Sequence, residues 1–240
     1  MKPLKQLSSV FITIIMICFF SSCINGLIHE NGNGKIIKQE RKLSGFNAIE
    51  VSGSFAVILK QDSLTSVNIE TDENLMQYIT TKIEGEKLII KSERSLDPTK
   101  DIFVYISSPN IKKIDLSGAV NLKSSNILTS SDLHIEISGV GKINLTLAVQ
   151  SLNIDCSGAG EIKLKGKADN VVAETSGASE IKAFELAVEN FKIKSSGAGE
   201  ANVSVNKKLD IDISGAGEIN YKGNPEISQK VSGAGSVHKE

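Results

Sequence analysis

The sequence predicts an all-β fold, a right-handed parallel β-helix with about 19 residues per coil. The first observation is that Ser-Gly-Ala or Ser-Gly-Val recurs at intervals of 21, 19, 19, 20, 18 and 18 residues. The serines of these corners are Ser117, Ser138, Ser157, Ser176, Ser196, Ser214 and Ser232. Such a period is typical of a solenoid, in which each unit buries its apolar face by stacking on a copy of itself.

The second observation is alternation on both sides of the serines. The positions five, three and one before the serine and five and seven beyond it are mostly apolar. The repeat around Ser157 illustrates this with Leu152, Ile154, Cys156, Ile162 and Leu164. A period of two predicts two half-buried strands flanking each corner, and the corner glycine is expected because it tolerates positive φ. The usual crossover rule makes the helix right-handed.

The repeats also predict the domain organisation. Residues 43–240 are expected to form a single β-helix domain, in which residues 117–235 carry the regular repeats. Residues 43–116 alternate less regularly and are expected to form irregular coils of the same sheet that cap one end. Within them, Glu73–Thr80 is the best candidate for one short helix.

The first 22 residues have the pattern of a lipoprotein signal peptide. Lys2 and Lys5 precede an apolar stretch, and Phe20-Ser21-Ser22-Cys23 resembles a bacterial lipobox, in which Cys23 is lipidated and becomes the mature N-terminus. The alternatives are an ordinary signal peptide with an incidental cysteine and an uncleaved anchor. Residues 23–42 are rich in Asn-Gly and are expected to be a tether. The expected location is the bacterial cell envelope, at the outer membrane, with the membrane face left open.

These features together resemble a known family. The lipobox, Asn31-Gly-Asn-Gly34, the segment Leu43-Ser-Gly-Phe46-Asn-Ala-Ile-Glu-Val-Ser-Gly53 and the Ser-Gly-Ala-Gly ladder occur in the order found in the head GIN domain family, described as putative auto-transporter adhesins of unknown function. The resemblance covers about residues 31–238. It implies a right-handed β-helix-like fold on a lipid-anchored or exported bacterial protein, and it implies no catalytic residues.

Composition excludes some classes of function. The formal net charge is −1, and the two arginines are Arg41 and Arg94, so a nucleic-acid partner is not expected. Once the signal peptide is removed and Cys23 is lipidated, Cys156 is the remaining thiol, which excludes an intramolecular disulfide and a cysteine-based metal site. Cys156 stands at an apolar position of its repeat and is interpreted as a small core residue.

Two outward positions of the repeat are acidic and could attract a divalent cation. Four residues beyond the serine stand Glu161, Glu180, Glu200 and Glu218. Two residues before it stand Glu136, Asp155 and Glu174, followed by Lys194. Either run offers oxygen ligands, but neighbouring lysines favour a solvated row of charges without a metal. These lysines are Lys142, Lys163 and Lys182.

The sequence contains no arrangement that favours catalysis. Its histidines, His29, His134 and His238, include no pair with metal-ligand spacing, and neither arginine lies in the repeats. The expected function is therefore a non-catalytic, lipid-anchored envelope protein that presents a β-solenoid for adhesion or scaffolding, with an envelope protein or a glycan as partner and no cofactor. The alternative is a carbohydrate-active β-helix enzyme or a polysaccharide-binding protein.

Overall fold

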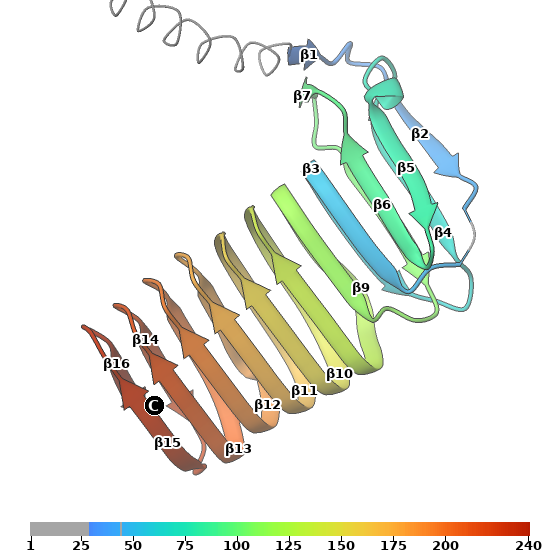
Figure 1. Cartoon of the computed structure of the whole chain (residues 1–240). Coiled ribbons are helices and arrows are strands. Elements are labelled where there is room, and N and C mark those ends of the chain that lie inside the picture. Colours follow the sequence, from blue (N-terminus) through green and yellow to red (C-terminus); the bar gives the residue numbers. More distant parts are fainter. Residues whose placement is uncertain (1–28, 44) are drawn as a thin grey trace, which may run out of the picture.

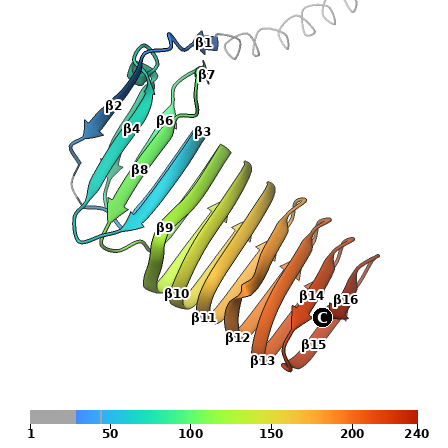
Figure 2. The same cartoon turned by 180° about the vertical axis from the view of Figure 1, so that it is seen from behind.

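A computed structural model of the protein describes residues 29–43 and 45–240, and it is almost entirely β-structure (Figure 1). The strands are β1 (His29–Asn31), β2 (Ile36–Arg41), β3 (Ala48–Gln61), β4 (Ser66–Asp72), β5 (Ile79–Glu84), β6 (Lys87–Ser92), β7 (Ser95–Asp97), β8 (Phe103–Ser108), β9 (Lys113–Ile137), β10 (Val140–Cys156), β11 (Ala159–Thr175), β12 (Glu180–Ser195), β13 (Glu200–Ile213), β14 (Glu218–Lys222), β15 (Glu226–Val231) and β16 (Ser236–Lys239). From β9 onward they stack coil upon coil as a β-solenoid (Figures 1 and 2). The predicted fold class is confirmed.

The register of the stacked coils reproduces the columns of the sequence. Strand β10 pairs with β11 in parallel from Val140 opposite Ala159 to Cys156 opposite Thr175. The five corner-aligned columns therefore lie one above another, and the residues that the alternation places inside are buried, as Ile154 and Leu164 show. One apolar core runs through the stack.

The long strands bend, so that successive parts of one strand lie on opposite sides of this core, and β9 contains a Ser-Gly corner as well (Figure 1). The burial pattern of β10 records the bend. Buried residues alternate up to Val149 and resume one position out of phase at Leu152. Two residues, Gln150 and Ser151, separate the buried Val149 from the buried Leu152, where regular alternation would leave only one. The strand therefore bends at Gln150 and Ser151, and the opposite set of alternate side chains faces the core after the bend. A coil thus consists of two strand halves, one long bend and one Ser-Gly corner.

Cys156 lies in this core and is 2% exposed. Burial raises the pKa of its thiol, which keeps the sulfur protonated and unreactive at neutral pH. The interpretation of Cys156 as a small core residue is confirmed.

The corner glycines are required for a reason that differs from the predicted one. Of the seven corner glycines, Gly118 and Gly233 have positive φ, whereas the others, including Gly158 and Gly177, do not. Their constraint is close approach, because a Cβ on Gly177 would overlap the carbonyl oxygen of Gly158 in the coil below. The same contact repeats from Gly139 onward.

The N-terminal part departs from the predicted coils. Strand β3 pairs in parallel with β9 and β8, as a coil would, but β4 is antiparallel to both β2 and β8, and β5 is antiparallel to β6. This end of the solenoid is closed by hairpin-like pairing rather than by further coils (Figure 2). The predicted helix over Glu73–Thr80 is wrong: a 3-10 turn, Met76–Tyr78, is present, and the chain returns to a strand at Ile79. No helix among the described residues is long and apolar enough to span a membrane.

The predicted tether over residues 23–42 also differs from the structure, because from His29 onward the chain belongs to the fold. Buried Asp72 holds this segment, accepting hydrogen bonds from Gly34 N at 2.7 Å and from Thr99 N and Oγ1 at 2.9 and 2.8 Å. Burial by itself raises the pKa of Asp72, but these hydrogen bonds outweigh it and lower the pKa below its ordinary value. A Cβ on Gly32 would overlap the Asp72 carboxylate, which accounts for a glycine in the Asn-Gly-Asn-Gly motif.

Close approach at the corner predicts the effect of one added methyl group. Gly177→Ala places a Cβ against backbone of the coil below, which cannot rotate away, so the free energy of unfolding should fall by about 1–3 kcal/mol. Urea titration measures the loss. Gly45→Ala is the matched control, since a Cβ at Gly45 meets nothing within 4 Å, and its change should stay within about 0.5 kcal/mol. Equal losses in the two variants would contradict the packing argument.

Candidate functional site

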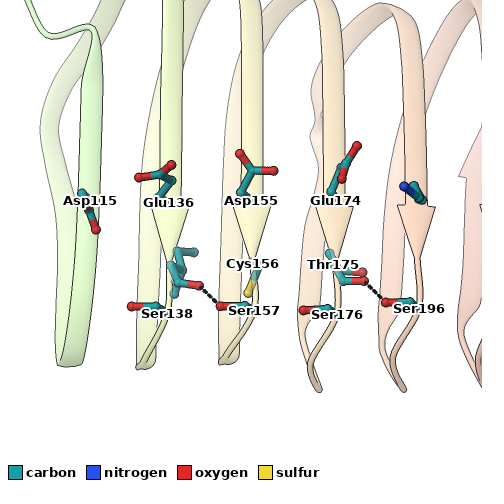
Figure 3. A pocket seen from close by; sticks show the side chains of 12 residues that line it. Asp115, Glu136, Ser138, Asp155, Cys156, Ser157, Glu174, Thr175, Ser176 and Ser196 are labelled. Carbon is teal, nitrogen blue, oxygen red and sulfur yellow. Dashed lines mark hydrogen bonds between the residues drawn. The ribbon is translucent and has the colours of Figure 1, made fainter.

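The coil register places two rows of polar side chains along one side of the solenoid. We define the carboxylate row as Asp115, Glu136, Asp155 and Glu174, and the serine row as Ser138, Ser157, Ser176 and Ser196 (Figure 3). The register pairs Glu136 with Asp155 and Asp155 with Glu174. Between the two rows lies a shallow groove of about 550 Å³. Successive coils each add a side chain to the two rows, with Lys194 standing next to Glu174 at the carboxylate position, so the groove is extended along the solenoid axis rather than closed around one point.

Two of the four serine hydroxyls of this groove are directed at the backbone. Ser157 Oγ donates to the carbonyl of Ile137 at 3.5 Å, and Ser196 Oγ donates to that of Thr175 at 3.4 Å (Figure 3). Neither hydroxyl is hydrogen-bonded to a carboxylate or an imidazole within the described part of the chain. This geometry does not activate them as nucleophiles.

Part of the carboxylate row is compensated by cations. Glu136 lies 2.7 Å from Lys113 Nζ and 3.1 Å from His134 Nε2, and the hydrogen bonds from these two groups lower the pKa of Glu136. Asp115 has no ion-pair partner among residues 29–43 and 45–240. Burial, followed by the neighbouring Glu136 and Glu50 carboxylates, raises the pKa of Asp115. Within the row, the negative charge of Glu136 is therefore stabilised, whereas that of the neighbouring Asp115 is destabilised.

His134 joins two members of the carboxylate row in the one group of possible metal ligands found in the described residues. Its Nε2 lies 3.1 Å from Glu136 and 3.4 Å from Asp155, and the ligand atoms of the three residues lie within 4.8 Å of one another. This group was not predicted, because the three histidines lack metal-ligand spacing with one another and His134 was not compared with the acidic residues. The signal for this group is the coil period, which places Asp155 directly beside Glu136.

The predicted cation candidates stack as expected, and lysines compensate two of them, Glu161 and Glu180. Register pairs run from Glu161 to Glu180, from Glu180 to Glu200 and from Glu200 to Glu218. Lys182 Nζ lies 2.9 Å from both Glu161 and Glu180, and its hydrogen bond lowers the pKa of Glu161.

Of the other two lysines expected beside this row, one contacts a row member and one does not. Lys142 lies 3.5 Å from Glu161, whereas Lys163 lies 3.8 Å from Glu185 instead. Asn202 donates to Glu200 at 2.6 Å. Side chains of this protein therefore occupy oxygens that a cation would need.

A second groove, of about 430 Å³, contains an aromatic surface that sequence reasoning missed. We define the aromatic platform as Phe103 and Tyr105 of β8, whose ring centroids lie 6.3 Å apart at an interplanar angle of 27°. The groove is lined by Phe103 together with Ile58, Asn121, Asn144 and Lys163. The sequence shows β8 as one more alternating segment, and its position beside β3 depends on pairing between distant strands.

The polar end of the platform is fixed by its neighbours. Tyr105 Oη donates to Glu70 at 3.2 Å, and Lys38 Nζ lies 4.1 Å from the centre of the Tyr105 ring. Burial, followed by the charge of Glu70, raises the pKa of the Tyr105 hydroxyl. Phe103 is thus the platform ring that borders the groove.

The remaining predicted residues are dispersed. His29 lies in β1, where its Nδ1 is 3.1 Å from Ser95 Oγ, and His238 lies in β16 at the opposite end. The predicted lipidation site, Cys23, lies outside the described residues, as does the signal peptide. Arg41 donates to the carbonyls of Met76 and Ile79 at 3.4 and 3.2 Å, and Arg94 pairs with Glu30, so both arginines hold the N-terminal end together.

The fold and the two grooves define a β-solenoid with an extended, shallow and repetitive surface. Comparison with protein families matches residues 45–225 to the putative auto-transporter adhesin, head GIN domain, and the chain belongs to this family. The family and the solenoid support an adhesion-like role for an envelope or surface protein. The resemblance stated from the sequence is confirmed.

Solved structures agree with this assignment. The chain is similar to a putative adhesin from Bacteroides fragilis (26% identity, TM-score 0.84, 88% of this chain and 100% of that chain). It is also similar to a putative adhesin from Parabacteroides merdae (26%, TM-score 0.69, 88% and 99%) and to a putative lipid binding protein from Parabacteroides distasonis (26%, TM-score 0.69, 89% and 100%). A comparison with curated proteins gave no match.

The raised pKa of Asp115 predicts how one variant changes stability with pH. A carboxyl whose pKa is raised on folding loses stability as pH rises through its ordinary and raised values, because ionisation is less favourable in the folded protein. Asp115→Asn should therefore increase the free energy of unfolding at pH 7 and leave it nearly unchanged near pH 3, where the wild-type acid is protonated in both states. Urea titration at both pH values measures the difference, and a loss of stability at pH 7 would contradict the assignment.

Proposed function

We propose that the protein is a non-catalytic, lipid-anchored envelope protein, held at the outer membrane through Cys23, that uses its solenoid surface to adhere to an envelope protein or a glycan. The observation that carries the proposal is the repetition of outward side-chain positions from coil to coil. Rows that continue over several coils create long, open grooves, which suit an extended partner better than a small substrate.

The contacts of the polar groups support a binding role over a catalytic one. The groove serines Ser157 and Ser196 donate to backbone carbonyls, and both arginines are engaged at the N-terminal end. A carbohydrate-active enzyme of this fold would need groups free to meet the substrate, and these two hydroxyls and both arginines are engaged by the protein, which leaves carboxylates such as Asp115 as the candidate acids or bases. Turnover of a polysaccharide by the purified protein would overturn the non-catalytic part of the proposal.

A polysaccharide partner is favoured by the aromatic platform. The face of a ring such as Phe103 packs against the apolar face of a sugar, while amide and ammonium groups such as Asn121, Asn144 and Lys163 bond its hydroxyls. The second groove combines both kinds of group.

The binding proposal is tested with residues 29–240 on an array of bacterial polysaccharides and by capture of envelope proteins. The similar Bacteroides fragilis crystal structure matches 88% of this chain over the whole of its own length. Phe103→Ala should weaken glycan binding about fivefold, since an aromatic contact contributes about 1 kcal/mol. Phe184→Ala, which removes an outward ring outside the groove, should leave binding unchanged. No bound glycan and no captured envelope protein would overturn the adhesion proposal.

The anchor is tested separately by mass spectrometry of the N-terminal peptide from the membrane fraction. An acylated Cys23 is expected there, because several acyl chains hold a protein at a membrane far more firmly than one does. Cys23→Ser should yield unprocessed or soluble protein, whereas Cys18→Ser, a change inside the apolar stretch, should leave processing intact. An unmodified Cys23 in the native protein would refute the anchor.

A further inference from the structure

The two ends of the solenoid differ in the geometry of their edge strands. At the N-terminal end the edge strands β2 and β5 are antiparallel to their partners β4 and β6, so the parallel geometry of the coils is not continued there. At the other end, β15 pairs with β13 and β16 pairs with β14, and neither has a second partner among the described residues (Figures 1 and 2). Their outer backbone groups form an open edge onto which another strand can pair.

The core of the solenoid continues to this edge and is partly exposed there. Ile227 and Val231 stand directly over Leu209 and Ile213 in the register of the coils. Leu209 and Ile213 are each 0% exposed, whereas Ile227 is 38% exposed and Val231 is 41% exposed. A further coil stacked on β15 would bury these two side chains as β15 buries the pair below.

The charges of β15 are arranged symmetrically about its centre. Glu226 and Lys230 both point outward and lie two residues on either side of Ser228. In an antiparallel pair of β15 strands centred on Ser228, Glu226 of each copy lies opposite Lys230 of the other. Opposite charges at directly facing positions stabilise a strand pair.

The coil below extends this complementarity. Register places Lys208 beneath Glu226 and Asp212 beneath Lys230, so signs already alternate between these coils. Antiparallel pairing with a second copy continues the alternation, since the column Lys208, Glu226 is followed by the partner's Lys230 and then the partner's Asp212. A strand with the same sign of charge at both outward positions would instead place like charges opposite each other in an antiparallel pair.

We propose that the coil formed by β15 and β16 is an interface for a second copy of this chain. The two copies pair edge to edge and antiparallel about a two-fold axis through Ser228, which sets Ile227 of each copy opposite the partner's Gln229 and satisfies the open edge. Because β1 lies at the far end of the solenoid (Figure 1), the N-terminal segments emerge at opposite ends of the dimer. With the anchor proposed above, such a dimer bridges two membranes.

Charge reversal tests the interface by sedimentation equilibrium of residues 29–240. The wild type should be a dimer, and Glu226→Lys or Lys230→Glu alone should weaken association at least about tenfold, because each places two pairs of like charges face to face. An equal mixture of these variants should form a heterodimer, since every facing pair is again of opposite sign. Lys192→Glu, on the middle coil β12, is the control and should dimerise like the wild type.

Two outcomes would overturn the proposal: a monomeric wild type at the concentrations used, or single reversals that dimerise as the wild type does. Circular dichroism of each variant separates a lost interface from a lost fold. The soluble chain lacks Cys23, so this result is independent of the anchor measured by mass spectrometry.

Discussion

The structure depends on the close approach of one coil to the next at the Ser-Gly corner. The carbonyl oxygen of each corner glycine occupies the space that a Cβ would take on the corner glycine of the coil above, as with Gly158 and Gly177. This contact holds the corners in line while the coil length varies. The bulge between Ala183 and Ala187 accordingly absorbs a change of register within β12 and β13, and the corner itself remains aligned. Fixed corners keep every column in register, and the columns then determine both the core and the surface.

Alignment of columns has an electrostatic consequence, because identical positions in successive coils face one another. Stacked acids repel, and the protein compensates in different ways on its two faces. In the glutamate row, Lys182 reaches both Glu161 and Glu180. In the carboxylate row, Lys113 and His134 pair with Glu136, while burial and the charges of Glu136 and Glu50 outweigh the more distant Lys113 and Lys87 and raise the pKa of Asp115. Exposed pairs of this kind contribute little to stability one by one, but they decide which charges remain available to a partner.

The repeats were predictable because their pairing is between neighbours in sequence. One period and one alternation suffice to place Ile154 in the core, Glu180 beside Glu161 and Cys156 out of reach of solvent. The N-terminal end has no such period. Strands β2, β4 and β8 pair across 25 or more residues and in the antiparallel sense, so alternation identified segments such as β8 without their neighbours. The aromatic platform was missed for this reason. The role of Asp72 was also hidden, since its partners Gly34 and Thr99 lie far away in the chain.

The same contrast explains why the two ends of the solenoid have different chemistry. A regular coil always presents a copy of its own open edge to the next coil, so repetition alone cannot end the stack. At the N-terminal end the chain abandons the coil: Asp72 ties the segment around Gly34 to Thr99, and antiparallel strands occupy the edge. At the other end the coil geometry persists through β15, where apolar Ile227 and Val231 remain partly exposed and the outward charges change sign about Ser228. An edge that keeps the coil geometry and also carries self-complementary charges is suited to one more coil, and a second copy of the chain supplies a coil of that shape.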